Sequence, residues 1–138
     1  MKNIIAFVED PGAANFFINK NFKLKKSIIL FSVEPAYSYL KLRNINSIHL
    51  KNIQDINDYI NSEIKLFLTG TSENKHSLAF ELISLCRKKK IKTFSLIDSP
   101  SSIENRFKGL KKDNFYYLTD YIGVSHENIK RKLIENGI

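Results

Sequence analysis

The 138-residue chain contains one cysteine, no tryptophan, three prolines and five glycines. The single cysteine, Cys86, excludes a disulfide framework and a cysteine-rich zinc site. No apolar run approaches the roughly 18 residues of a membrane helix, and the apolar stretch 4–8 is too short for a signal peptide. Low-complexity tracts and linkers are also absent. We therefore expect one cytoplasmic domain over residues 1–138, without a metal or a cofactor.

Acidic residues are fewer than basic ones, at 14 against 22, which gives a formal net charge of +8. Such an excess can indicate a nucleic-acid or anionic-membrane partner. Only four of the basic residues are arginine, however, and arginine is the side chain that binds phosphate bidentately. The composition therefore argues against nucleic-acid binding and leaves weak attraction to anionic lipid or phosphorylated molecules open.

Several motifs with known chemistry are missing. The first strand-end loop has Gly12, Ala14 and Phe17 where a dinucleotide-binding loop needs three glycines. No G-x-x-x-x-G-K-[ST] loop and no G-x-S-x-G elbow occurs anywhere in the chain. The sequence therefore excludes a nucleoside-triphosphatase loop and gives no sign of an α/β-hydrolase nucleophile.

Short apolar segments alternate with helical patterns along the whole chain. The pattern predicts strands at 3–9, 27–33, 47–50, 65–69, 92–97 and 121–124, and helices at 11–22, 35–43, 55–62, 73–89 and 127–136. Apolar strands separated by helices indicate a mostly parallel sheet with helices on both faces. We predict a single α/β, Rossmann-like domain with a doubly wound six-stranded sheet in the order 3-2-1-4-5-6.

The least ordinary segments follow strands one, four and five. They are EDPGAAN at 9–15, GTS at 70–72, and Asp98-Ser99 with Arg106 further along the same loop. In a sheet of this order, ligands bind outside the carboxyl ends of the strands, where the strand order reverses. We therefore expect these three loops to meet at one binding site.

Each of these residues also has a structural interpretation. Asp10 before Pro11 is a good helix cap, while Gly12 would let backbone amides approach an anion or a sugar hydroxyl. The stretch 70–72 either caps the long helix or binds a ligand. Asp98 can orient a hydroxyl, act as a base or cap the next turn, and Arg106 can form a salt bridge or contact a phosphate.

Four stretches give the chain a family resemblance: 8–15 (VEDPGAAN), 69–72 (TGTS), 94–99 (FSLIDS) leading to 105–107 (NRF), and 120–125 (DYIGVS) with 132–138 (KLIENGI). On these it resembles the N-terminal, acceptor-side Rossmann-like domain of bacterial GT-B-type glycosyltransferases of surface-polysaccharide biosynthesis. It is more distantly similar to UDP-sugar 2-epimerases.

The resemblance implies a two-domain architecture in which a second domain binds the nucleotide-sugar, so the chain alone would not transfer sugar efficiently. It implies that Asp98 is the catalytic base, and that the ligand contacts come from Asp10, Gly12, Asn15, Gly70, Thr71, Ser72, Ser99 and Arg106. The sequence departs from this family at 100–102, where Pro100 and two serines replace a common aromatic residue.

The implied partner is a sugar or lipid-linked sugar acceptor. The stretch 108–117, basic and aromatic, could contact the inner face of a membrane or be a strand and a solvated loop. Two alternatives stay open: a half domain of a nucleotide-sugar epimerase, and a non-catalytic α/β module that binds a small anion.

Overall fold

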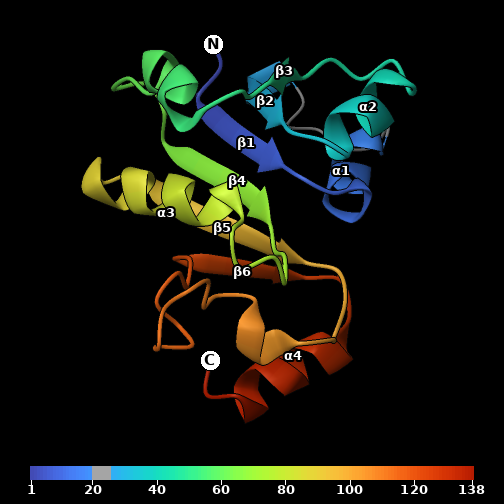
Figure 1. The fold of residues 1–138 in the computed structure, drawn as a ribbon, viewed down its shortest axis with the longest axis vertical. Coiled ribbons are helices and arrows are strands. Elements are labelled where there is room, and N and C mark those ends of the chain that lie inside the picture. The colour runs from blue at the N-terminus through green and yellow to red at the C-terminus, as the bar shows by residue number, and fades with distance from the viewer. Residues whose placement is uncertain (20–25) are drawn as a thin grey trace.

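The computed structural model describes residues 1–19 and 26–138, which form a six-stranded, all-parallel sheet flanked by helices (Figure 1). The strand order is β3-β2-β1-β4-β5-β6, which confirms the predicted Rossmann-like topology. The strands are β1 (Ile4–Val8), β2 (Ile28–Ser32), β3 (Ile48–His49), β4 (Leu66–Gly70), β5 (Lys92–Ile97) and β6 (Tyr121–Val124).

Apolar side chains of the strands point alternately to the two faces of the sheet and form a core layer on each face. Ile5 and Phe7 of β1 face the layer that holds α3 (Leu78–Lys88) and the 3-10 helix η2 (Ile53–Tyr59). Ile4, Ala6 and Val8 face the layer beneath α1 (Pro11–Ile18) and α2 (Ala36–Lys41). Because successive side chains point to opposite faces, a wholly apolar strand is covered on both sides.

A third, smaller cluster covers the far end of the sheet. There α4 (Glu127–Glu135) contributes Ile129 and Leu133, which pack with Ile97 and with residues around the short 3-10 helix η3 (Ile103–Asn105). In Figure 1 this part of the chain, orange to red, lies beyond β6. The long excursion between β5 and β6 is therefore packed through Ile103 and Phe107.

Two predicted helices differ from those observed. The long helix begins at Leu78 rather than at residue 73, and its N-cap is Ser77, whose hydroxyl accepts from the Ala79 amide. Upstream, the Ser72 hydroxyl accepts from the Asn74 amide and the Asn74 side chain accepts from the His76 amide. Such local side-chain bonds compete with helix formation, so the interpretation of 70–72 as the cap of this helix was wrong.

The second difference lies in the segment predicted as a helix at 55–62. It is the 3-10 helix η2, and it begins earlier because Asn52 and Asp55 form a reciprocal capping box. The first helix ends at Ile18, and the remainder of its predicted range, to residue 22, extends outside the described residues. Strands β5 and β6 have the predicted bounds.

Candidate functional site

The loops after β1, β4 and β5 lie at the same edge of the sheet, because these three strands are neighbours in the strand order. Two close approaches join them. A Cβ built on Gly12 would lie 2.8 Å from Asp98 Oδ2, and one built on Gly70 would lie 2.4 Å from Ala13 Cβ. The amino end of α1 is therefore packed against the ends of both β4 and β5.

Asp10 forms the cap of α1. Its Oδ1 accepts from the Ala13 amide at 2.8 Å, its backbone is extended, and Pro11 occupies the first helical position. The same Oδ1 would lie 3.1 Å from a Cβ on Gly12. Thus Asp10 and Asp98 both place a carboxylate oxygen beside Gly12, where the positive end of the helix dipole favours negative charge. A Cβ at position 12 would meet the end of the Asp98 side chain, so a larger residue there would turn this carboxylate away.

Asp98 is exposed at the end of β5, and within residues 1–19 and 26–138 its side chain forms no hydrogen bond or ion pair. The next residue, Ser99, is held in a turn, since its hydroxyl lies 3.0 Å from the Ser101 hydroxyl and accepts from the Ser101 amide. A carboxylate that has no partner among the described residues can accept hydrogen bonds from a ligand hydroxyl.

Arg106 is 6% exposed and connects two of the loops. Its Nε donates to the Ser101 carbonyl at 2.9 Å, and its Nη1 donates to the Thr71 hydroxyl at 2.8 Å and, more weakly, to the Thr71 carbonyl. The Thr71 hydroxyl also donates to the Leu96 carbonyl at 3.3 Å. We call Thr71, Ser101 and Arg106 the arginine latch. Among the described residues, no Asp or Glu pairs with Arg106, and its side chain is buried. Arg106 therefore positions the loops after β4 and β5.

Glu9 is not among the predicted contacts, yet it is the carboxyl of this edge whose pKa is shifted. Its Oε2 accepts from the Ser77 hydroxyl at 2.8 Å, whereas Oε1 is buried and has no hydrogen-bond partner in the part of the chain that is described. Burial raises the pKa of Glu9 above its usual range, and hydrogen bonds from Ser77 and Ser72 offset this only in part. A carboxyl at the end of an apolar strand was the available signal, the same one that selected Asp98.

A small cavity separates Glu9 from the loop after β4. It measures about 10 Å³ and is lined by Glu9, Asp10, Ala13, Thr69, Gly70, Thr71, Ser72, Ser77 and Ala79. A space of roughly this size holds about one water molecule, provided that polar partners surround it. The predicted contacts Gly70, Thr71 and Ser72 line this cavity rather than a larger cleft.

Two predicted contacts do not face the space between the loops: Arg106, whose donors bond to Ser101 and Thr71, and Asn15. Asn15 is exposed on α1, and its Oδ1 accepts from the Tyr39 hydroxyl of α2 at 2.7 Å. Its side chain is therefore directed to α2, whereas Gly12 on the same helix lies against Asp98.

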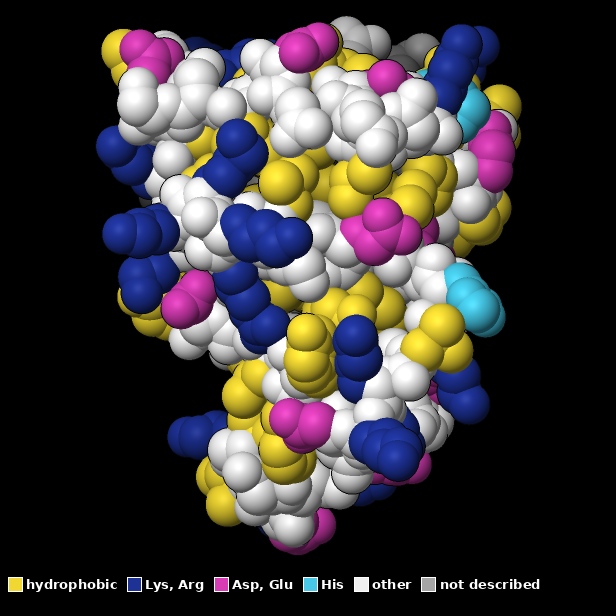
Figure 2. Space-filling model, turned by 60° about the vertical axis from the view of Figure 1, so that its left-hand side comes forward, with side chains coloured by type: hydrophobic (Ala, Val, Ile, Leu, Met, Phe, Trp, Pro, Cys, Tyr) yellow, Lys and Arg dark blue, Asp and Glu magenta, His cyan; other side chains and the backbone are white. Residues whose placement is uncertain are grey.

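The two edges of the sheet have opposite charge character. Carboxylates gather at the carboxyl edge, while Lys65, Lys89, Lys90 and Lys92 line a hollow of about 690 Å³ at the amino ends of β4 and β5. Figure 2, which brings the left-hand side of Figure 1 forward, shows many Lys and Arg side chains there. Among the described residues, no group of three or more His, Cys, Asp or Glu side chains is arranged to hold a metal ion.

The basic and aromatic stretch 108–117 is a series of turns, not a strand. Leu110 is 68% exposed, and the Lys111 ammonium lies 4.7 Å from the centre of the Tyr116 ring. Arg87 of α3 donates to the carbonyls of Tyr116 and Leu118, which fixes the end of this stretch. No helix in the ranges 1–19 and 26–138 combines the length and the hydropathy needed to cross a membrane.

Comparisons of the chain with protein-family models, with curated proteins and with solved structures found no match.

Proposed function

We propose that this domain is the acceptor-binding domain of a glycosyltransferase-like enzyme in surface-glycan biosynthesis, completed by a second domain that binds the nucleotide-sugar. The observation that carries the proposal is the position of Asp98. Its exposed carboxylate has no partner among the described residues and lies against Gly12 at the amino end of α1, on the edge where α/β sheets bind ligands.

In this function, Asp98 accepts a hydrogen bond from the acceptor hydroxyl and takes its proton as that oxygen attacks the anomeric carbon of the donor. The bond between the anomeric carbon and the phosphate oxygen breaks, and the nucleotide leaves. Asp10 and the first turn of α1 bind neighbouring hydroxyls. The arginine latch holds the loops that carry Asp98 and Thr71 at a fixed separation, because Arg106 bonds to both. Glu9 lines the small cavity together with Thr71 and Ser72.

The same proposal includes a contact between residues 108–117 and the cytoplasmic face of a membrane or a lipid-linked acceptor. Leu110 is exposed, and Lys108, Lys111 and Lys112 surround it in the sequence. An apolar side chain among lysines suits an anionic lipid surface.

Ligand-observed NMR on the 138-residue chain tests the proposal, with simple sugars and UDP-sugars as the probes. We expect saturation transfer to a sugar acceptor, and we expect Asp98→Asn to weaken its binding about tenfold, because hydrogen bonds to a charged group are worth roughly 1.5–3 kcal/mol. Asp58→Asn, which changes an exposed acid of η2, is the matched control. Binding of neither class of ligand by the folded chain would refute a sugar-active site.

Glu9 favours a second candidate, the half domain of a nucleotide-sugar epimerase. Epimerisation needs a carboxyl that can supply a proton near neutral pH, and burial raises the pKa of Glu9. Saturation transfer from the chain to a UDP-N-acetylhexosamine and to a simple sugar separates the two candidates, because binding does not require turnover by a second domain. Binding of the UDP-sugar alone supports the epimerase, and binding of the simple sugar alone supports the transferase.

The third alternative, a module that binds a small anion, has less support at this edge. Arg106 is buried and already donates to two carbonyls and two hydroxyls, and the charged groups beside Gly12 are carboxylates. Titration with inorganic phosphate, followed by amide shifts of residues 10–14 and 71–72, tests this alternative directly.

A further inference from the structure

The outer edge of β2 is only partly covered. Strand β3 has two residues, and they pair with Phe31 and Ser32 at the carboxyl end of β2. The first three residues of β2, Ile28 to Leu30, have no partner strand on this side among the described residues.

The hydrogen bonds of β2 show which of its peptide groups face this open edge. Asn3 donates to the Ser27 carbonyl and Val33 donates to the Val8 carbonyl, so the odd-numbered residues bond to β1. On the other side, Leu50 donates to the Ser32 carbonyl, so the even-numbered residues face β3. The amides of Ile28 and Leu30 therefore point to the open edge, where nothing in residues 1–19 and 26–138 accepts from them. Both residues are buried, at 6% and 9% exposed, and an unpaired amide in such a place is uncommon.

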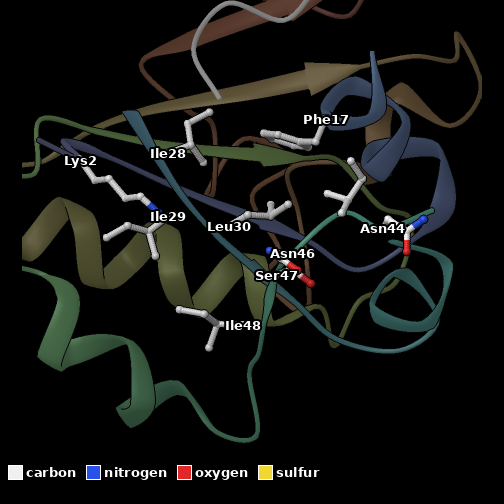
Figure 3. A pocket seen from close by; sticks show the side chains of 10 residues that line it. Lys2, Phe17, Ile28, Ile29, Leu30, Asn44, Asn46, Ser47 and Ile48 are labelled. Carbon is white, nitrogen blue, oxygen red and sulfur yellow. The ribbon is translucent and has the colours of Figure 1, made fainter. Parts of the chain in front are cut away.

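A hollow of about 390 Å³ lies along this edge (Figure 3). Most of its lining is apolar, from Phe17 of α1, the three β2 residues, Ile45 and Ile48, and its polar lining is Lys2, Asn44, Asn46 and Ser47. Figure 3 shows Ile28, Leu30 and Phe17 on one side of the hollow, with Asn46, Ser47 and Ile48 on another. Unpaired strand amides beside apolar side chains form the surface to which an extended peptide adds as a strand.

The lysines along this edge favour a peptide with acidic residues. Lys2 lines the hollow, and a neighbouring hollow of about 300 Å³, which shares residues 44–47, is lined by Lys41. No described Asp or Glu lines either hollow, and the whole chain carries a net charge of +8. A second copy of this chain would bring lysine against lysine, whereas acidic residues at the ends of a peptide would pair with Lys2 and Lys41.

We propose that the open edge of β2 binds an extended peptide with alternating apolar side chains and acidic ends, which pairs with Ile28 and Leu30 as an added strand. The peptide takes the position that β3 leaves uncovered and places its apolar side chains in the hollow. This site is separate from the edge that carries Asp98, so it goes beyond the proposed enzymatic function.

The test uses a fluorescein-labelled decapeptide of three Val–Thr repeats flanked by two glutamates at each end. Fluorescence anisotropy with the 138-residue chain is expected to show saturable binding, and Lys2→Glu is expected to weaken it about fivefold, as reversal of an exposed charge does. Lys130→Glu, an exposed lysine of α4, is the matched control and should leave the affinity unchanged. Hydrogen exchange of the Ile28 and Leu30 amides should slow about tenfold when the peptide is bound.

A second peptide separates strand addition from side-chain contact alone. Methylation of the three valine amides removes the peptide's donors on one side and keeps its side chains and charge, and it is expected to abolish binding. Three results would each overturn the proposal. The methylated peptide could bind equally well, the peptide could leave the exchange of Ile28 and Leu30 unaltered, or no peptide could bind at millimolar concentration. If the amides became protected without peptide as the protein concentration rose, and sedimentation velocity showed a dimer, a second copy of the chain would cover this edge. That result would also overturn the proposal.

Discussion

At the scale of single residues, burial controls the chemistry of two titratable groups. Cys86 is 2% exposed on the inner face of α3, and burial raises the pKa of its thiol from 9.0 to about 12, although nearby Lys89 acts in the opposite direction. The thiolate is the reactive form of cysteine. Cys86 therefore belongs to the core and not to any reactive site.

We expect native Cys86 to resist iodoacetamide at pH 8 and to react readily in denaturant, because unfolding removes the burial. Mass spectrometry after a timed pulse of reagent measures the difference. Rapid labelling of the native chain at the same rate as the unfolded chain would show that the thiol is accessible.

Glu9 is expected to make stability depend on pH. As pH rises through the usual carboxyl pKa of 4.5, the unfolded chain loses this proton first, because burial raises the pKa in the folded state. Folding stability from this group therefore falls with increasing pH until the folded-state pKa is passed. Glu9→Gln removes the effect, so its stability relative to the natural chain should increase from below pH 4.5 to pH 8 in urea titrations. A difference that stays constant over this range would contradict the assignment.

At the scale of elements, the position of α1 depends on the contact between Gly70 and Ala13. A Cβ at position 70 would lie 2.4 Å from the Ala13 Cβ, a distance that requires the helix or the strand to move. At Gly12 the obstacle is the end of the Asp98 side chain, which can rotate.

We therefore expect Gly70→Ala to destabilise the fold by about 1–3 kcal/mol, as overpacking does, and Gly12→Ala to have a smaller effect. Urea denaturation of the two variants provides the comparison. Equal stability of Gly70→Ala and the natural chain would mean that α1 is not in close contact with β4.

The arginine latch joins elements through one planar side chain. Lysine cannot donate to the Ser101 carbonyl and the Thr71 hydroxyl in the same geometry, so Arg106→Lys should cost about 1–3 kcal/mol. Arg131→Lys, on the exposed side of α4, is the control and should be near neutral. In amide NMR spectra, the latch variant should shift Thr71 and Ser101, and a change confined to residues near 106 would argue against the connection.

At the scale of the whole molecule, the centre of the sheet is covered most completely. Strands β1 and β4 each pair on both sides, and β1 is buried along its full length, whereas β6 is the last strand and none of its residues is fully buried. Native-state hydrogen exchange should therefore be slowest in β1 and β4 and faster in β6. If β6 amides exchanged as slowly as those of β1, β6 would unfold only together with the central strands, and this expectation would be wrong.

The fold was predictable because periodicity is a local property. Wholly apolar strands such as 4–8 separated by helical patterns permit only a parallel sheet covered on both faces, and the usual strand order of such sheets places three loops at one edge. The start of α3 was not predictable in the same way, because Ser72 and Asn74 form turns that compete with the helix.

The candidate site also has some features that local sequence determines and others that long-range contacts determine. The sequence by itself determined that Asp10 caps a helix and that Asp98 ends a strand, since both depend on adjacent residues. Only the tertiary structure decided that Gly12 lies against Asp98 and that Arg106 is buried between Thr71 and Ser101. It also decided that the Asn15 side chain bonds to α2 and that Glu9 is removed from solvent. These features arise from groups that are distant in the chain, and their solvation is set by packing that no local pattern records.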